Sequence, residues 1–321
     1  MGWRGSMRSM AAIARAVDRD AQRRYKIAIK NQMIADATEA VAQWEEYIDK
    51  LAHIRISDSP PFNWHRTANQ PKPSQPIKRT TQEQLALLAL DKFKPGFFDF
   101  LWGGSESRRR KLVSVLERAK LTDAQEYDEA KKQYKVAFTE WEADISLAER
   151  VLRGEPSAYK EVAEEFLSQN KDEFIGTSIS ISFSHDQIHA KPIVHGTEIV
   201  PAFQRKQTTT GKLSETKMPI SRCNELYQDY VAGVAFQVAS DFFSILPVDE
   251  IFVTCLANIV NTQSGYLEDT PILSVRFIRT TMEHLNLEQV DPSDALAKFQ
   301  HAMRFKKLTG FSRVEPLKPL D

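Results

Sequence analysis

Several features that mark common protein classes are scarce in this sequence of 321 residues. It has only two cysteines, Cys223 and Cys255, which excludes a disulfide framework and a cysteine-rich zinc site. No apolar run approaches the length of a membrane-spanning helix. The formal net charge is zero, so no overall basic excess points to nucleic acid. These absences favour a reducing compartment. We therefore expect a cytoplasmic protein with no membrane association, no cofactor and no metal.

The charge is unevenly distributed along the chain. Residues 1–30 hold eight basic side chains and only two acidic ones, Asp18 and Asp20. Residues 121–173 hold seven basic and fourteen acidic side chains. Two long segments of opposite charge in one chain can neutralise each other, as flanking charges do in coiled coils.

Two long segments have the spacing of apolar residues that is typical of helices. The first covers about Ser6 to Ile56 without proline, and the second covers 105–153. Between them lie a stretch with five prolines over 57–80, a short helix over Thr81–Phe93 with Leu85, Leu88 and Ala89 on its apolar side, and an apolar turn. We therefore predict a helical unit over residues 1–153 with a proline-rich and apolar connector at 57–104.

The second long helix carries one continuous stripe of mainly apolar residues. A compact connector and complementary charges predict that the two long helices form an antiparallel, coiled-coil-like hairpin, in which Val17 lies opposite Ile145 and Ile27 lies opposite Tyr134. In this arrangement the acidic second helix neutralises the basic start of the chain. The stripe consists of Leu112, Leu116, Ala119, Asp123, Tyr127, Ala130, Tyr134, Ala137, Trp141, Ile145, Ala148 and Leu152.

Residues 154–321 predict a mixed α/β domain with a small, mainly antiparallel sheet. Strict alternation over Phe174–Phe183 and Val/Ile/Phe-rich runs over Glu250–Val260 and Pro271–Arg279 indicate strands. Residues 222–246 predict a broadly apolar helix, and a second helix is predicted from Asp291 to about Phe305. The whole chain is therefore assigned to the α+β class.

Basic residues in two places are the candidate nucleic-acid contacts. A polar loop over 205–222 has five basic residues and one acid, and a glycine turn opens the second long helix with a basic run. Thr208–Lys212 superficially resembles a phosphate-binding loop but lacks its first glycine. The candidate contacts are Arg205, Lys206, Lys212, Lys217, Arg108, Arg109 and Arg110.

Two features of the C-terminal part were considered as possible catalytic or metal sites: a group of histidines and the order of its helices and strands. His185, His189 and His195 lie close in sequence, but His185 and His189 on one continuous strand would be ~13 Å apart, too far to share one metal ion. The order α-β-β-β-α-β from Tyr159 to Val260 resembles nucleases of the PD-(D/E)xK type. That resemblance implies catalytic carboxylates at Asp186 and Glu198, yet the position of the motif lysine holds a valine.

The predicted function is therefore non-catalytic. We expect an interaction or scaffold component of an intracellular complex, which binds a partner protein or a second copy of itself through the helical hairpin. The alternative is a nucleic-acid-binding protein, or a degenerate nuclease of the PD-(D/E)xK type, that uses the C-terminal domain.

Overall fold

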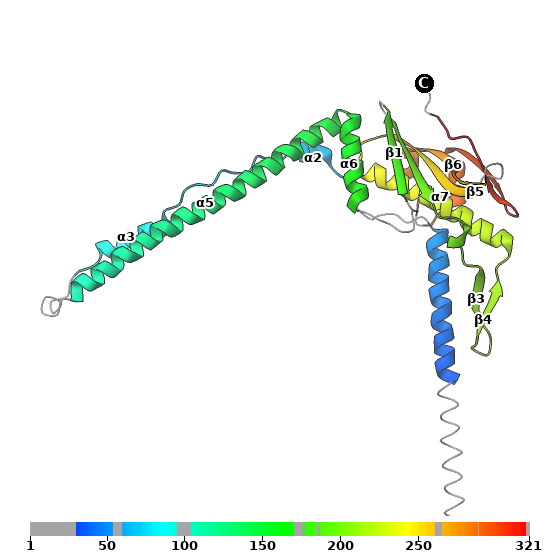
Figure 1. Cartoon of the computed structure of the whole chain (residues 1–321), viewed down its shortest axis with the longest axis horizontal. Helices are drawn as coiled ribbons and strands as arrows, with labels where there is room; N and C mark the ends of the chain where they lie inside the picture. Colours follow the sequence, from blue (N-terminus) through cyan, green and yellow to red (C-terminus); the bar gives the residue numbers. More distant parts are fainter. Residues whose placement is uncertain are drawn as a thin grey trace, which may run out of the picture. The chain divides into compact units, whose positions relative to one another are not determined.

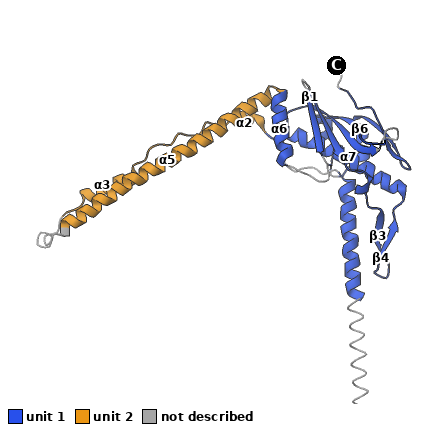
Figure 2. Cartoon of the chain, in the orientation of Figure 1, with its two compact units in different colours: residues 1–62, 156–321 blue, residues 63–155 orange. Residues whose placement is uncertain are grey.

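The computed structural model describes residues 30–53, 60–94, 104–169, 176, 178–184, 187–260, 265–287 and 289–318 (Figure 1). The chain divides into two compact units, which Figure 2 shows in different colours. Unit 1 combines residues 1–62 with residues 156–321, and unit 2 comprises residues 63–155. The sequence predicted a single boundary after residue 153, so the second boundary, after residue 62, is new.

A six-stranded sheet forms the centre of unit 1. The strand order is β1-β2-β5-β6-β7-β8, and only the β2–β5 pair is parallel. The mixed, mainly antiparallel sheet and the α+β class are therefore confirmed. The strands are β1 (Ser178–Ser184), β2 (Gln187–Val194), β5 (Glu250–Val260), β6 (Leu267–Ile278), β7 (Gln300–Lys306) and β8 (Gly310–Ser312).

Helix α7 (Ile220–Ile245) packs on the central strands of this sheet and contributes more buried apolar residues than any other described element. Its apolar surface is wide, as predicted, because helix α6 (Pro156–Gln169) also packs against it through the Phe166–Phe242 ring pair. Phe236 lies 4.9 Å from Phe277 between ring centroids, and both rings are fully buried. Burial of such side chains contributes about 1.5–3 kcal/mol each.

The prediction of one helix from Asp291 to Phe305 is correct only for its first turns and wrong for the residues that follow. Asp291 does cap a short helix, α9 (Pro292–Ala295), by accepting from the Asp294 amide, and η2 (Leu296–Lys298) follows. The chain then forms strand β7, which pairs with β6. Local helix propensity over this stretch is overridden because the edge of β6 offers backbone hydrogen bonds. A further short helix, α8 (Arg279–Glu283), follows β6.

The polar loop predicted over 205–222 is instead a β-hairpin followed by the start of α7. After η1 (Thr197–Ile199), strand β3 (Phe203–Gln207) pairs antiparallel with β4 (Leu213–Lys217) in a separate two-stranded sheet. Its turn is closed by the Thr208 amide donating to the Lys212 carbonyl at 2.8 Å. Gly211 has a φ of +83° there, a conformation that other residues rarely adopt.

The first long helix is helical over its described residues, 30–52, and belongs to unit 1. Leu51 is buried and, like Lys50 and His53, lies beside Tyr230 and Gly233 of α7. Val17 and Ile27 lie outside the described residues. The long N-terminal hairpin is therefore not confirmed, and charge neutralisation within the chain stays a prediction.

Unit 2 is organised around helix α5 (Gly104–Leu152), whose 49 residues make a rod about 74 Å long. Helices α2 (Trp64–Ala68) and α3 (Thr81–Asp91) pack on it. Residues 69–80, which we call the strap, run antiparallel to α5 between them. Within the described ranges, no helix combines the length and hydropathy that crossing a membrane requires.

The strap is held by aromatic side chains of α5. The indole of Trp141 donates to the Gln70 carbonyl at 3.0 Å, and the Lys72 ammonium lies 4.7 Å from the centroid of the Phe138 ring. The strap prolines remove backbone donors, so this segment is extended and relies on such side-chain contacts. Of the twelve predicted stripe residues only Ala137 is exposed, so the stripe is confirmed as the less exposed side of α5.

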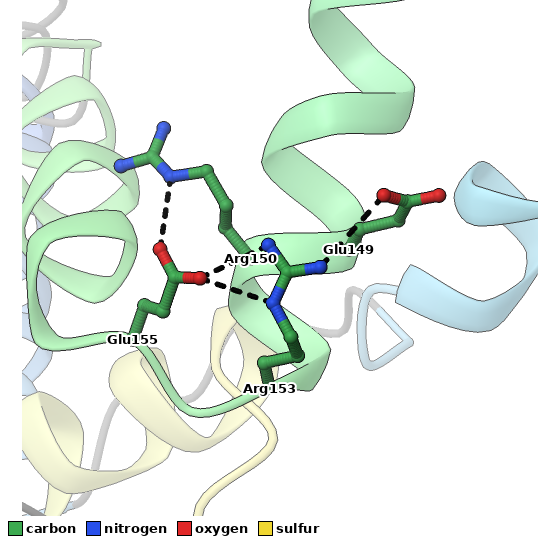
Figure 3. Close-up of polar contacts among 4 residues, drawn as sticks. All are labelled: Glu149, Arg150, Arg153 and Glu155. Atoms are coloured by element: carbon green, nitrogen blue, oxygen red, sulfur yellow. Dashed lines mark hydrogen bonds and ion pairs between the residues drawn. The ribbon is translucent and has the colours of Figure 1, made fainter.

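The C-terminal end of α5 is closed by a Schellman motif. The Gly154 amide donates to the Val151 carbonyl, and the Glu155 amide donates to the Arg150 carbonyl. Gly154 has a φ of +74°. Figure 3 shows the Glu155 carboxylate between Arg150 and Arg153, and Arg153 also pairs with Glu149. The hydrogen bond from Arg153 is the main cause of the lowered pKa of Glu155.

Replacing Gly154 tests this motif. We expect Gly154→Ala to lower the free energy of unfolding by about 1 kcal/mol, because a Cβ disfavours the left-handed conformation. Gly154→Asn is the matched control, since asparagine tolerates that conformation better. Chemical denaturation followed by circular dichroism measures both. An alanine variant as stable as the wild type would show that the motif does not depend on glycine.

Candidate functional site

A cavity in unit 1 lies between helix 30–52 and the β3–β4 hairpin. It has a volume of about 430 Å³ and is open to solvent. Its walls are mainly aromatic and aliphatic. The lining residues are Gln43, Trp44, Tyr47, Pro201, Ala202, Phe203, Arg205 and Glu215. We refer to it as the aromatic pocket.

Two hydrogen bonds fix the aromatic rings of the helix wall. The Trp44 indole donates to the Phe203 carbonyl at 3.0 Å, and the Tyr47 hydroxyl donates to the Ile199 carbonyl at 2.7 Å. Partial burial raises the pKa of Tyr47. Because these polar groups are already bonded to the backbone, the rings present mainly their apolar faces to the pocket. The Phe203 ring remains 53% exposed.

The hairpin is docked along the helix at its other end as well. The Gln207 amide donates to the Ile34 carbonyl at 3.2 Å and to the Thr38 hydroxyl at 2.9 Å. A Cβ on Gly211 would lie 2.6 Å from Ile34, so the turn approaches the helix as closely as glycine allows. These contacts hold the two walls of the aromatic pocket at a set separation.

The structure places four predicted nucleic-acid contacts on this hairpin but not on one face. Side chains alternate along a strand, and the register pairs Arg205 with Glu215 and Phe203 with Lys217 on the side toward the helix. Arg205 forms an ion pair with Glu215 at 2.8 Å. Lys206 lies on the opposite face, and Lys212 lies at the turn. All four are on the hairpin rather than in an irregular loop.

The other three predicted contacts lie in unit 2, in the first turns of α5. Arg108, Arg109 and Arg110 are exposed and, as consecutive helical residues, point about 100° apart. Arg110 pairs with Glu106 of the preceding turn at 3.2 Å. These arginines therefore do not form a single basic patch on one face of the helix.

The histidines do not form a metal site in the described part of the chain. His185 lies outside the described residues, and the His195 backbone bonds to the hydroxyls of Tyr227 and Tyr230. The His189 ring is bonded at 2.7 Å to the Thr254 hydroxyl, which lies 2.8 Å from the Ser274 hydroxyl. Burial, with a smaller effect of Lys191, lowers the pKa of His189 to about 4.

This chain of hydroxyls connects strands through buried hydrogen bonds. Thr254 and Ser274 are fully buried, and the Leu317 amide donates to Ser274 at 3.0 Å. The network therefore joins strands β2, β5 and β6 to the segment that follows β8. A buried polar chain with every member bonded specifies one arrangement of a sheet.

The placement implied by the nuclease resemblance is wrong for Glu198. Glu198 lies in η1 rather than on a strand, and its carboxylate accepts from the Gly196 amide. The β3–β4 pair that follows is separate from the main sheet. Asp186 lies outside the described residues. The third strand of the expected order therefore does not bring a carboxylate into the centre of the sheet.

Helix α3 of unit 2 has its apolar residues on the unexpected side. The sequence predicted that Leu85 and Leu88 would pack inward, but they are 63% and 52% exposed. Ala86 is buried instead and packs with Leu116 and Ala119 of α5. Leu87 is also exposed. We refer to Leu85, Leu87 and Leu88 as the outer leucines.

Asp123 of α5 sets this rotation of α3. Its buried carboxylate accepts from the Gln82 and Glu83 amides, at 3.3 and 2.9 Å, at the N-terminus of α3. The negative charge of Asp123 also stabilises this end of α3, because the helix dipole is positive at the N-terminus. Residues 82 and 83 must therefore face α5. One turn later this puts Ala86 against α5 and turns the outer leucines away.

Comparison with models of known protein families, with curated proteins and with solved structures finds no match to this chain.

Trp44, Phe203 and Asp123 were not predicted as site residues. Trp44 and its partner Phe203 are 159 residues apart, so no local pattern links them. Asp123 offered a usable signal, because a carboxylate in an apolar stripe must find donors.

The pH dependence of stability tests the His189 network. The pKa of His189 in the fold lies below its usual value of 6.5, so the unfolded chain binds the proton more readily. The contribution of His189 to stability should therefore fall by about 1–3 kcal/mol as the pH falls from 6.5 to 4. We expect His189→Asn to flatten this dependence and the exposed control His284→Asn to retain it, in denaturation series at several pH values. Equal slopes for all three proteins would contradict the assignment.

Proposed function

We propose that this protein is a non-catalytic interaction component that binds a partner protein through the α3 side of unit 2. The observation that carries the proposal is the inverted packing of α3, in which an alanine faces α5 and three leucines face solvent. Burial of one leucine contributes about 1.5–3 kcal/mol. If no partner covered these leucines, we would expect α3 to pack with them against α5.

The core of unit 2 supports an interaction role. Its buried apolar cluster of α3 and α5 consists of Ala86, Leu116 and Ala119, with Leu90 packed against it. Val113 and Val115 of α5 are also exposed. Exposed apolar side chains of this kind are typical of surfaces that bind a partner.

The charge around the outer leucines favours one kind of partner. Residues 104–120 have six basic and two acidic side chains, and residues 76–94 have four basic and two acidic ones. An apolar surface within a basic border is complementary to an amphipathic helix with acidic flanks. A second copy of α3 would bring basic borders together, so we favour a different protein.

Site-specific photocrosslinking in the native cell tests this proposal. A benzoylphenylalanine at position 88 should crosslink to a segment of another protein, and mass spectrometry should identify that segment as an acidic amphipathic helix. The matched control is position 136, an exposed valine on the acidic part of α5. Leu85→Ser together with Leu88→Ser should remove at least nine tenths of the co-purified partner, whereas Val136→Ser should not.

Two results would contradict the proposal. Crosslinks at position 88 that join two copies of this chain would replace the partner by self-association, which sedimentation equilibrium would confirm. Equal crosslinking from positions 88 and 136 would show that the outer leucines have no special role.

A further inference from the structure

We propose that the aromatic pocket and the β3–β4 hairpin of unit 1 bind single-stranded nucleic acid, with a base stacked against Phe203. This site is independent of the α3 surface, and neither proposal requires the other. It rests on three properties of the described residues: ring surfaces with their polar groups already bonded, lysines without ion pairs, and a cavity of suitable size.

The pocket offers ring faces rather than hydrogen-bonding groups. Trp44 and Tyr47 donate their polar hydrogens to backbone carbonyls, so neither is left to select a particular base edge. Phe203 is half exposed at the mouth. Every base has an apolar face, and stacking on aromatic side chains is therefore tolerant of sequence. A cavity of about 430 Å³ accommodates one base with its sugar.

The charges nearest the pocket favour a phosphate backbone. Arg205 neutralises Glu215, the only carboxylate among the lining residues. No ion pair of Lys206, Lys212 or Lys217 is found in the described ranges. Lys217 is the cross-strand neighbour of Phe203 on the same face, so its ammonium can reach a phosphate beside a base stacked there.

The acidic residues of helix 30–52 do not line the pocket. Glu46 is paired with Lys50, and Glu39 accepts from the side-chain amide of Gln43. The positive charge nearest the pocket therefore comes from the lysines of the hairpin.

A single strand fits these features better than a duplex. In a duplex the bases are stacked on each other and no base face is available to Phe203. The lysines are spread over both faces of the hairpin and its turn, which matches a strand that bends around it. Backbone contacts of this kind give binding that weakens steeply with salt.

Fluorescence anisotropy with the full chain and a labelled 20-nucleotide deoxythymidine strand tests the proposal. Phe203→Ala should weaken binding about tenfold. Lys212→Ala together with Lys217→Ala should also weaken binding and lower the slope of log affinity against log salt by about 1.4. Tyr266→Ala and Lys306→Ala are matched controls on exposed residues of unit 1 and should bind as the wild type does.

An abasic strand with the same number of phosphates separates stacking from charge. It should bind the wild type about as weakly as the deoxythymidine strand binds Phe203→Ala, and Phe203→Ala should weaken it no further. The proposal is overturned if the abasic strand binds the wild type as tightly as deoxythymidine does. Equal competition by a duplex or by polyglutamate, or no binding at 50 mM salt, would overturn it as well.

Discussion

The hydrogen bonds from the N-terminus of α3 to Asp123 are the constraint on which unit 2 depends. A carboxylate buried in an apolar stripe must find donors, and the Gln82 and Glu83 amides supply them. Both residues then face α5, and so does Ala86 one turn later. The outer leucines are left in solvent as a direct geometric consequence. This polar contact therefore decides which side of α3 faces α5, and it leaves the apolar side of the helix exposed.

Unit 1 follows a similar logic, in which polar contacts create an apolar surface. The hydrogen bonds of Trp44 and Tyr47 to backbone carbonyls hold helix 30–52 against the segment that includes β3. Each bond uses the polar atom of an aromatic side chain and leaves the ring as a wall. The Gln207 bonds and the close approach of Gly211 set the other end of the hairpin. The two proposed surfaces thus arise from separate interactions and can be tested separately.

The sequence predicts regular elements well and their partners poorly. The α5 stripe and strand β5 were found because periodicity is a local property of the chain. Residues 69–80 were not predicted to contact α5, since this proline-rich segment carries no periodic signal, yet they lie against α5 through Trp141 and Phe138. The residues of β7 were predicted to be helical because their strand conformation depends on pairing with β6, which the local sequence does not show. The aromatic pocket joins residues 159 positions apart, which no local pattern links.

The rotation of α3 is tested most directly by disulfide trapping. In a chain with Cys223 replaced by serine, cysteines are introduced in place of Ala86 and Ala119, or in place of Leu88 and Ala119. Our account predicts that the 86–119 pair oxidises rapidly within the monomer and that the 88–119 pair stays reduced. Rapid oxidation of the 88–119 pair, with the 86–119 pair unreacted, would place the leucines against α5. The proposed partner surface would then not exist.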